Sequence, residues 1–387
     1  MNETYDIIVS GHLCLDMIPD MSQVSPESLN LSGRLIETGA IDVSTGGVVS
    51  NTGLALQRLG MRVGLMAIVG DDLLGHVITS FLNQRDPKMS ALIKTEKGKG
   101  SSYSVVLSPQ KRDRSFLHYP GTNALFGAEH VDYETVSRAK IFHLGYPPIM
   151  PQLIKDQGFE LQSIYSRIKS AGVVTSMDMV VPDPNGPSGK ADWKAILQNV
   201  LPYVDIFIPS IDEALYMLRR KDYDLWKDDV LSHLTREYLF ELSEELIDMG
   251  VVVAGFKLGE MGIYLRTAEK SSLDRLSKLS IDIDEWAEIE TWQAAFKVQV
   301  ASTNGAGDAA YAGFLAAMQR GLSPDECLQW ANAVGACNVE KVDATSGVQT
   351  WEETESRLEN EWPIREMRLT GIRRIDTVLQ NVPTLSF

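Results

Sequence analysis

Ser302-Thr-Asn-Gly-Ala-Gly-Asp308 runs directly into AAYAGFLAAMQRG, which ends at Gly321. The second part is rich in small and apolar residues and predicts a helix that stops at this glycine. The first part is therefore a glycine-containing turn that leads into a helix N-terminus, where backbone N–H groups have no intrahelical acceptor and the helix dipole is positive. We expect the amides of Gly305, Ala306 and Gly307 to form an anion site, suited to a phosphoryl group whose charge grows during transfer.

Asp308 lies in the same turn. A carboxylate beside a phosphate site repels the phosphate, so it is expected there only if it has a chemical role. Asp308 could accept the proton of an attacking hydroxyl group and so act as a general base. Because aspartate is also favoured at helix N-termini, Asp308 could instead cap the helix. The sequence of this turn leaves both roles open.

A second glycine-containing turn, Ser44-Thr-Gly-Gly-Val-Val-Ser-Asn51, opens a helical pattern over residues 48–59. Gly46 and Gly47 let the backbone approach a ligand closely, and Asn51 offers a donor and acceptors from the first helical turn. A tight turn with a solvated Asn51 explains the same residues equally well.

Asp16 follows the first predicted strand, in Gly11-His-Leu-Cys-Leu-Asp16. Open α/β sheets bind ligands at the carboxyl ends of their strands. A carboxylate in that place can hold two sugar hydroxyls at once. The alternative is a solvated aspartate in a turn.

Short apolar runs alternate with helical patterns along most of the chain. Buried strands are expected at 6–10, 62–69, 140–144, 173–179, 205–208 and 251–257. This alternation predicts an α/β fold, with a doubly wound, mainly parallel sheet that carries helices on both faces. Residues 34–44 and 101–119 break the pattern, because polar and apolar residues alternate there without an intervening helix. They predict a small, separate antiparallel sheet that could act as a lid; an extension of the main sheet is the alternative.

Composition argues against several classes of protein. The net charge is −16, and Lys and Arg are scattered rather than gathered into the basic stripe of a nucleic-acid binder. No apolar run reaches the ~20 residues of a membrane helix, and the N-terminus lacks a secretory signal pattern. Three cysteines without paired spacing favour a reducing, cytoplasmic location. The P-loop pattern, a G-x-G-x-x-G after a strand, G-x-S-x-G and zinc-ligand spacings are also absent from the sequence.

Together these motifs resemble those of the ribokinase-like, or PfkB, family of carbohydrate and nucleoside kinases. Residues 44–75 are similar to the family's N-terminal signature, and residues 302–314 to its C-terminal signature. The strand expected at 251–257 and Gly259 lie between them. The similarity extends from Asp6 to about Gly347, and it implies a ribokinase-like doubly wound core with a small antiparallel β lid.

The resemblance assigns roles to individual residues. It implies Asp308 as the base and the amides of Gly305, Ala306 and Gly307 as the anion hole. The acceptor would be held by Asp16, Gly46, Gly47 and Asn51. The nucleotide would lie along Lys257, Gly259, Thr303 and Asn332. Glu213, in Pro209-Ser-Ile-Asp-Glu-Ala214, matches the N-x-x-E element that organises Mg²⁺ and phosphate, here through water.

The implied activity is ATP-dependent, Mg²⁺-requiring phosphorylation of a hydroxyl group on a sugar or sugar-like molecule. A nucleoside kinase of the same fold is the first alternative, since a nucleobase could stack on Tyr103, Phe116, His118 or Tyr146, which could equally pack against a sugar. A catalytically silent ligand-binding or scaffold relative is the second; the intact Asp308 and glycine turn argue against it. The partners expected are ATP, the small acceptor and a second copy of the chain that pairs through the lid, with no nucleic acid or membrane.

The expected organisation is one kinase domain over residues 1–365 and a C-terminal tail over 366–387. Lid segments are expected at about 17–45 and 99–120, and insertions at about 219–245 and 268–299. After Gly347, Trp351 and Trp362 are expected to dock the end of the chain onto the domain.

Two residues depart from the family pattern. Ser210 stands where the family usually has asparagine, so the water network around Mg²⁺ is expected to differ. Ser302 stands where many members have an aspartate that helps to bind a monovalent cation. Loss of that carboxylate predicts little K⁺ dependence, unless backbone carbonyls or Asp343 complete the site.

Overall fold

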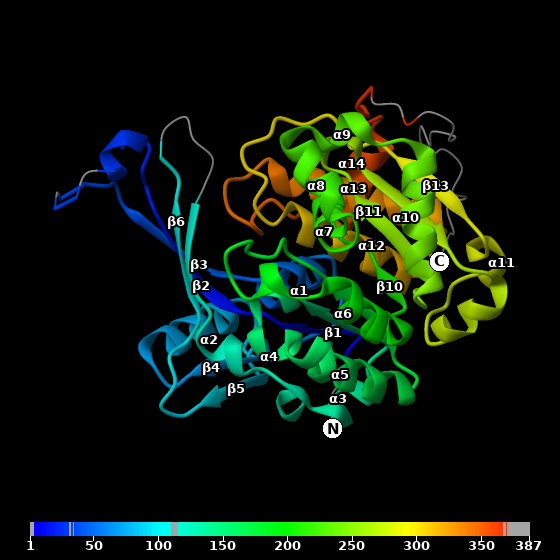
Figure 1. The fold of residues 1–387 in the computed structure, drawn as a ribbon, viewed down its shortest axis with the longest axis horizontal. Helices are drawn as coiled ribbons and strands as arrows, with labels where there is room; N and C mark the ends of the chain where they lie inside the picture. The colour runs from blue at the N-terminus through cyan, green and yellow to red at the C-terminus, as the bar shows by residue number, and fades with distance from the viewer. Residues whose placement is uncertain (1–3, 31, 34, 110–114, 367–368, 370–387) are drawn as a thin grey trace.

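The computed structural model describes residues 4–30, 32–33, 35–109, 115–366 and 369, and within them nine strands form the main sheet (Figure 1). Their order is β13-β12-β11-β10-β9-β8-β1-β4-β5. From β5 to β11 every neighbouring pair is parallel, whereas β12 is antiparallel to both β11 and β13. The strands are β1 (Ile7–Gly11), β4 (Val63–Gly70), β5 (Leu92–Glu96), β8 (Ile141–Gly145), β9 (Val174–Asp178), β10 (Ile206–Phe207), β11 (Val253–Lys257), β12 (Ile263–Thr267) and β13 (Glu290–Gln293).

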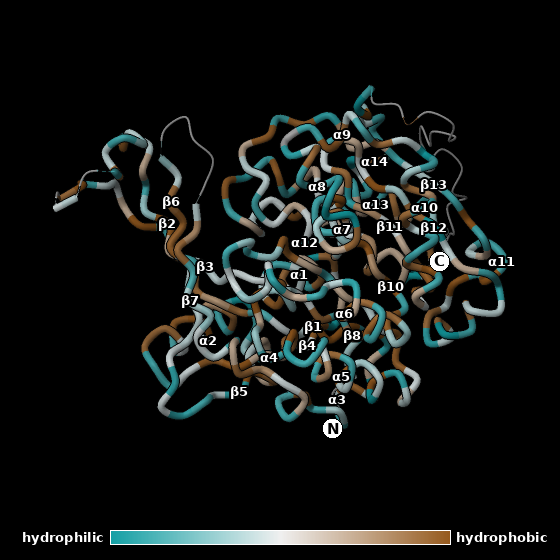
Figure 2. Tube along the Cα trace, viewed as in Figure 1, coloured by the Kyte–Doolittle hydropathy of each residue, from teal (hydrophilic) through white to brown (hydrophobic). Residues whose placement is uncertain are grey.

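Helices cover both faces of this sheet, as predicted. Successive strand residues point to opposite faces, so Ile7 and Val9 belong to one hydrophobic cluster and Ile8 to the other. Figure 2 shows the hydrophobic residues following the buried strands. The first face carries α1 (Val48–Arg58), α2 (Leu73–Arg85), α11 (Ile283–Trp286), α12 (Ala306–Gln319), α13 (Pro324–Val339) and α14 (Trp351–Glu359). The second carries α3 (Tyr133–Ser137), α4 (Pro151–Ile154), α5 (Phe159–Ser170), α6 (Trp193–Val200), α7 (Ile211–Leu218) and α10 (Arg236–Asp248).

The lid is a separate four-stranded sheet that projects from the body of the molecule (Figure 1). Its order is β3 (Ile41–Gly46), β2 (Cys14–Pro19), β6 (Tyr103–Leu107) and β7 (Ser115–Tyr119). The prediction of an antiparallel sheet is wrong for one pair, because β2 and β6 are parallel. Both strands leave the carboxyl edge of the parallel main sheet, β2 after β1 and β6 after β5, so they enter the lid in the same direction. Residue 34, where the first alternating stretch of the predicted lid begins, lies outside the described residues, as do residues 110–114 of the second stretch.

The charged stretch at 219–245 is helical but broken into α8 (Arg220–Trp226), α9 (Val230–His233) and α10. The stretch at 268–299 contains α11, and its strand β13 forms the outer edge of the main sheet. The predicted boundary between domain and tail stays a prediction, since most of 366–387 lies outside the described residues.

Two tryptophans dock the chain end on the body, as expected. The Trp351 ring stacks on Trp330 with 3.4 Å between ring centroids, and the Arg320 guanidinium lies 3.9 Å from the Trp351 ring. Trp362 stacks on Phe296 at 4.5 Å.

Replacing Trp351 with alanine removes the stack on Trp330 while leaving the main sheet intact. We expect the free energy of unfolding to fall by about 2 kcal/mol, measured by urea denaturation. Glu359→Ala, at an exposed position of the same helix, should change it by less than about 0.5 kcal/mol. Equal effects of the two substitutions would show that the stack does not hold α14.

Candidate active site

The carboxyl ends of the parallel strands meet the N-terminus of α12 at one cavity of about 700 Å³. Tyr146 follows β8, Asp178 ends β9 and Lys257 ends β11, so three strands of the parallel sheet deliver these side chains to the same edge. The predicted anion turn forms another part of the wall. The lining residues used below are Tyr146, Asp178, Ser210, Asp212, Glu213, Lys227, Val230, Leu231, Lys257, Gly259, Thr303, Gly305, Ala306, Gly307 and Asp308.

Asp308 is only 4% exposed, and three side chains donate hydrogen bonds to its carboxylate. Asn51 Nδ2 reaches Oδ2 at 3.0 Å, and Thr52 Oγ1 reaches Oδ1 at 3.2 Å. The Tyr146 hydroxyl lies 2.6 Å from Oδ1 and 2.7 Å from Oδ2. The N-cap of α12 is Gly305, and no side chain caps that helix end. The geometry therefore contradicts the helix-cap alternative for Asp308.

The protonation of this cluster follows from its burial. Burial raises the pKa of Asp308 to about 6, and the nearby Asp178 carboxylate adds to the rise, while the donors Tyr146 and Asn51 lower it. Burial and the carboxylates of Asp308 and Asp178 raise the pKa of Tyr146 well above its ordinary value. The phenol therefore keeps its proton and acts as a donor to Asp308.

Lys257 at the end of β11 and Glu213 in the first turn of α7 line the same cavity as the anion turn. Lys257 Nζ donates to Asp178 Oδ1 at 2.7 Å. Burial opposes the charged form of Lys257, but Asp178 and Glu213 outweigh it and raise the Lys257 pKa above its ordinary value. Glu213 is buried, and burial raises its pKa to about 7. Part of its carboxylate caps α7, because the Ser210 N–H donates to Oε2 at 2.7 Å and the Ser210 hydroxyl accepts from the Glu213 N–H.

The anion turn leads into the N-terminus of α12, as predicted, but the amide of Ala306 already donates a hydrogen bond within the turn. Gly305 has a left-handed backbone (φ 67°) and Ala306 begins the helix. The Ala306 N–H donates to the Thr303 carbonyl at 3.3 Å. A side chain built at Gly307 would place its Cβ 3.4 Å from Lys257 Nζ, so glycine leaves room between this amide and the lysine.

The predicted acceptor residues gather under the lid. A Cβ on Gly46 would lie 2.1 Å from Asp16 Oδ2, and one on Gly47 (φ 85°) would lie 2.4 Å from His12 Nδ1. His118 Nδ1 is 3.1 Å from Ser104 Oγ, and its ring lies 5.2 Å from the His12 ring. Burial raises the pKa of Asp16. Both glycines are thus required for the backbone to pass close to these polar groups.

Tyr103 lies on the opposite face of the lid from His118. Ser104 pairs with His118 and with Asp16, whereas Tyr103 pairs with Tyr119 and Leu15. Because strand side chains alternate, Tyr103 faces away from the polar residues, and its ring lies 5.6 Å from that of Tyr119. The structure therefore does not bring this residue into the acceptor site, contrary to the prediction.

A second cavity, with a smaller volume of about 370 Å³, adjoins the first one, and both are lined by Lys257, Gly259 and Thr303. Its walls are mostly apolar, with Ile263, Ala295, Phe296, Val298, Ala310, Ala331, Ala336 and Val339. Asn332 lies at this cavity, where its Nδ2 donates to the Gln293 carbonyl at 3.1 Å. The volume and the apolar lining suit an aromatic ring such as adenine.

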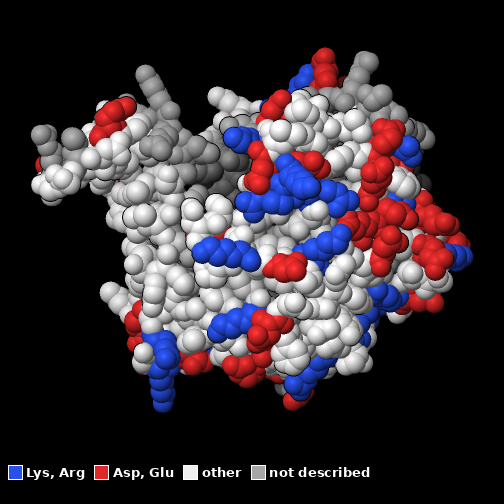
Figure 3. All heavy atoms as spheres, viewed as in Figure 1, with Lys and Arg blue, Asp and Glu red and all other residues white. Residues whose placement is uncertain are grey.

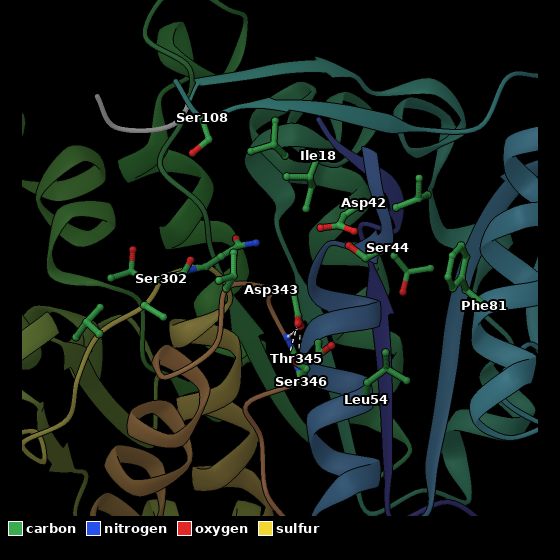
Figure 4. Close-up of a pocket in the computed structure, with 18 of the residues that line it drawn as sticks. Ile18, Asp42, Ser44, Leu54, Phe81, Ser108, Ser302, Asp343, Thr345 and Ser346 are labelled. Carbon is green, nitrogen blue, oxygen red and sulfur yellow. Dashed lines mark hydrogen bonds between the residues drawn. The ribbon is translucent and has the colours of Figure 1, made fainter. Parts of the chain in front are cut away.

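A third cavity, of about 700 Å³, separates the lid from the core (Figure 4). Ile18, Asp42 and Ser44 approach it from the lid, and Leu54 and Phe81 from the helices. Ser302 and Asp343 lie on its core side, and both are engaged locally. Ser302 Oγ accepts from the Asn304 N–H at 3.1 Å, and Asp343 accepts from the N–H groups of Thr345 and Ser346.

A family model described as pfkB family carbohydrate kinase matches residues 6–351. The chain belongs to the PfkB family of carbohydrate kinases. The 2-dehydro-3-deoxygluconokinase of Bacillus subtilis is 23% identical over 332 residues, which cover 85% of this kinase and 91% of that protein. The "Uncharacterized sugar kinase" of Archaeoglobus fulgidus is 24% identical and covers 76% of this kinase and 98% of its own length.

The ribokinase of Arabidopsis thaliana, solved in complex with ribose and ATP, shares the fold of this kinase. Its TM-score is 0.69 at 19% identity, covering 92% of this chain and 98% of that one. In the described part of the kinase, no helix is long and apolar enough to cross a membrane.

Sequence reasoning missed two residues of the cluster. Thr52 follows the predicted ligand Asn51 on the same helical turn, and its hydroxyl reaches Asp308. Asp178 ends a predicted strand, which is the position that drew attention to Asp16. The same argument could therefore have found Asp178.

Tyr146→Phe removes one donor from Asp308, so the pKa of this carboxyl should rise further above 6. If Asp308 is the general base, as predicted, only its ionised form is active, so activity should exist above this pKa and be lost as the pH falls through it. The acidic limb of the kcat/KM profile for the acceptor should accordingly move to higher pH, with a loss of less than about tenfold at high pH. Tyr203→Phe, away from the cluster, should leave the limb in place; an unmoved limb in Tyr146→Phe would contradict the hydrogen bond.

Proposed function

We propose that this kinase transfers the γ-phosphoryl group of ATP to a hydroxyl group of a sugar or sugar-like acceptor, with Asp308 as the general base. The observation that carries the proposal is the buried Asp308 carboxylate at the N-terminus of α12, next to the glycine turn. Family membership supports the substrate class, and the apolar cavity beside Thr303 supports ATP.

In the proposed reaction, the oxygen of the acceptor hydroxyl forms a bond to the γ-phosphorus while Asp308 takes the proton of that hydroxyl. The bond between that phosphorus and the β,γ-bridging oxygen breaks, and ADP leaves with the electron pair. The amides of Gly305 and Gly307, aided by the helix dipole, stabilise the charge on the phosphoryl oxygens. Asn51 and Thr52 hold the carboxylate of the base in a fixed orientation.

The residues at this site fit a Mg²⁺ ion that arrives with ATP. Mg²⁺ keeps several waters and is usually held by one or two carboxylates plus substrate phosphates. Among the described residues no group of three or more His, Cys, Asp and Glu side chains forms a preassembled metal cluster. Glu213, buried at the cavity and with its pKa raised to about 7, would ionise beside the cation and bind its waters. Mg²⁺ would supply charge neutralisation at the phosphates.

The acceptor class rests on the polar residues under the lid. Asp16 and His118 lie on the same face of the lid sheet and supply hydrogen bonds of the kind sugars need. With Tyr103 on the opposite face, the aromatic wall expected for a nucleobase loses one member. Measuring ADP release with a panel of sugars, sugar acids and nucleosides separates the two classes, and faster turnover of nucleosides would reject the sugar proposal. Pairing of two copies through the lid and a cytoplasmic location stay predictions.

Asp308→Asn keeps the shape of the base but removes its basicity. We expect kcat to fall by about 10²–10⁴-fold. ATP affinity, measured by titration calorimetry, should change by less than about threefold. Turnover near the wild-type value in the purified variant would remove Asp308 from the role of base.

K⁺ dependence should be weak, because the groups that could bind the ion are engaged. Asn338 Nδ2 donates to the Asn304 carbonyl at 2.9 Å, and Asp343 is committed to its own turn. We expect less than about twofold difference in kcat/KM between K⁺ and a tetramethylammonium buffer, since a serine at 302 brings no negative charge. Strong activation by K⁺ would show that carbonyls and Asp343 rearrange into a site.

A further inference from the structure

The α8–α9 insertion, between α7 and α10, contributes to the wall of the cavity at the N-terminus of α12, where phosphoryl transfer is proposed. Lys227, Val230 and Leu231, at the junction of α8 and α9, line the same cavity as Gly305, Gly307 and Asp308. In Figure 3, Lys and Arg side chains gather over α7 and α8, whereas Asp and Glu gather on the side of α10 and α11. In a protein of net charge −16, Lys227 brings a positive charge to the cavity that would receive a polyanion.

The junction is held by aromatic packing. The Trp226 ring stacks on His233 of α9 at 5.0 Å and lies 5.0 Å from Tyr238 of α10. The Tyr238 hydroxyl in turn donates to Asp222 of α8 at 2.5 Å. These contacts fix the end of α8, and with it the position of the residue that follows Trp226.

Lys227 has a backbone conformation that disfavours a side chain. Its φ is 46° and its ψ is −114°, close to the first central position of a type II′ turn, where glycine is strongly preferred. Strained residues of this kind persist when surrounding structure holds them, and they cluster at functional sites. The chain carries a lysine at a position where the backbone conformation would be less strained with glycine.

The charge on Lys227 has no protein partner among the described side chains, whereas the other lysine of the cavity is paired. Lys257 Nζ is 2.7 Å from Asp178 Oδ1, and both groups are almost fully buried. Asp212, Glu213 and Asp308 add further carboxyl groups to the wall. A triphosphate entering this cavity therefore meets one neutralised lysine and one available lysine.

We propose that the Lys227 ammonium group binds the terminal phosphate oxygens of ATP and makes the α8–α9 insertion part of the catalytic machinery. The inference rests on the proposed function of the cavity. During transfer, Lys227 would stay protonated and stabilise the charge on the oxygens around the γ-phosphorus, while the acceptor proton still goes to Asp308. Val230 and Leu231 would exclude water on the same side of the cavity.

The test compares Lys227→Met with Lys221→Met, an exposed lysine of α8 that does not line the cavity. Binding is measured by calorimetry with Mg·ATP and with adenosine. Loss of a charge-assisted hydrogen bond should weaken Mg·ATP binding by about 10- to 100-fold in Lys227→Met and leave adenosine binding unchanged. Lys221→Met should match the wild type with both ligands.

A second variant separates the charge from the fold. Lys227→Gly removes the ammonium and also relieves the positive φ, so its Tm should rise while Mg·ATP binding falls as in Lys227→Met. Mg·ATP affinity within about twofold of wild type in both variants would overturn the role of Lys227 and leave the proposed kinase site standing. A wild-type protein that binds neither Mg·ATP nor adenosine would overturn both.

Discussion

The carboxylate of Asp308 is buried, and a buried carboxylate costs several kcal/mol unless hydrogen bonds compensate for lost water. Two of its donors, Asn51 and Thr52, lie on α1, and the third, Tyr146, follows β8. All three are more than 160 positions away from Asp308 in sequence. This one requirement therefore fixes how α1, α12 and the carboxyl edge of the sheet meet. Tyr146 has a left-handed backbone (φ 67°), and from this turn its hydroxyl reaches both carboxylate oxygens.

The same cavity balances several charges in a small volume. The buried Asp178 is neutralised by Lys257, and that pair sets the electrostatic environment of both Glu213 and Asp308. Burial raises the pKa of Glu213 to about 7 and that of Asp308 to about 6, so near neutral pH the site holds less negative charge than its composition suggests. An incoming cation would favour the ionised form of Glu213, which links metal binding to phosphate binding. Two carboxyl groups with raised pKa values in one cavity are typical of a functional site.

Sequence patterns predicted the core of the fold well, because buried parallel strands and their helices leave strong apolar periodicity. The strands at β1, β4, β8, β9, β10 and β11 lie within about two residues of their expected positions. β5, β12 and β13 were missed. β5 and β13 are short edge strands that include the polar residues Lys94 and Glu290, so they carry little apolar signal. The face of Tyr103 depended on lid register, which no local pattern specifies. Ser210-Ile-Asp-Glu213 was interpreted as a metal-organising element, but it also has the S-x-x-E spacing of a capping box. The structure shows that capping box at the N-terminus of α7, and the metal role stays a prediction.

The turn from Ser302 to Asp308 borders all three cavities of the site. Thr303 lines all three cavities: the transfer cavity, the apolar nucleotide-sized cavity and the cavity beneath the lid. The turn is held from behind, because a Cβ on Gly305 would lie 2.4 Å from the Ala344 carbonyl. It cannot shift toward one cavity without changing the others. If the lid closes over an acceptor as predicted, it would approach the same seven residues that carry the proposed base and anion hole, and closure would then be coupled to alignment of the reacting groups.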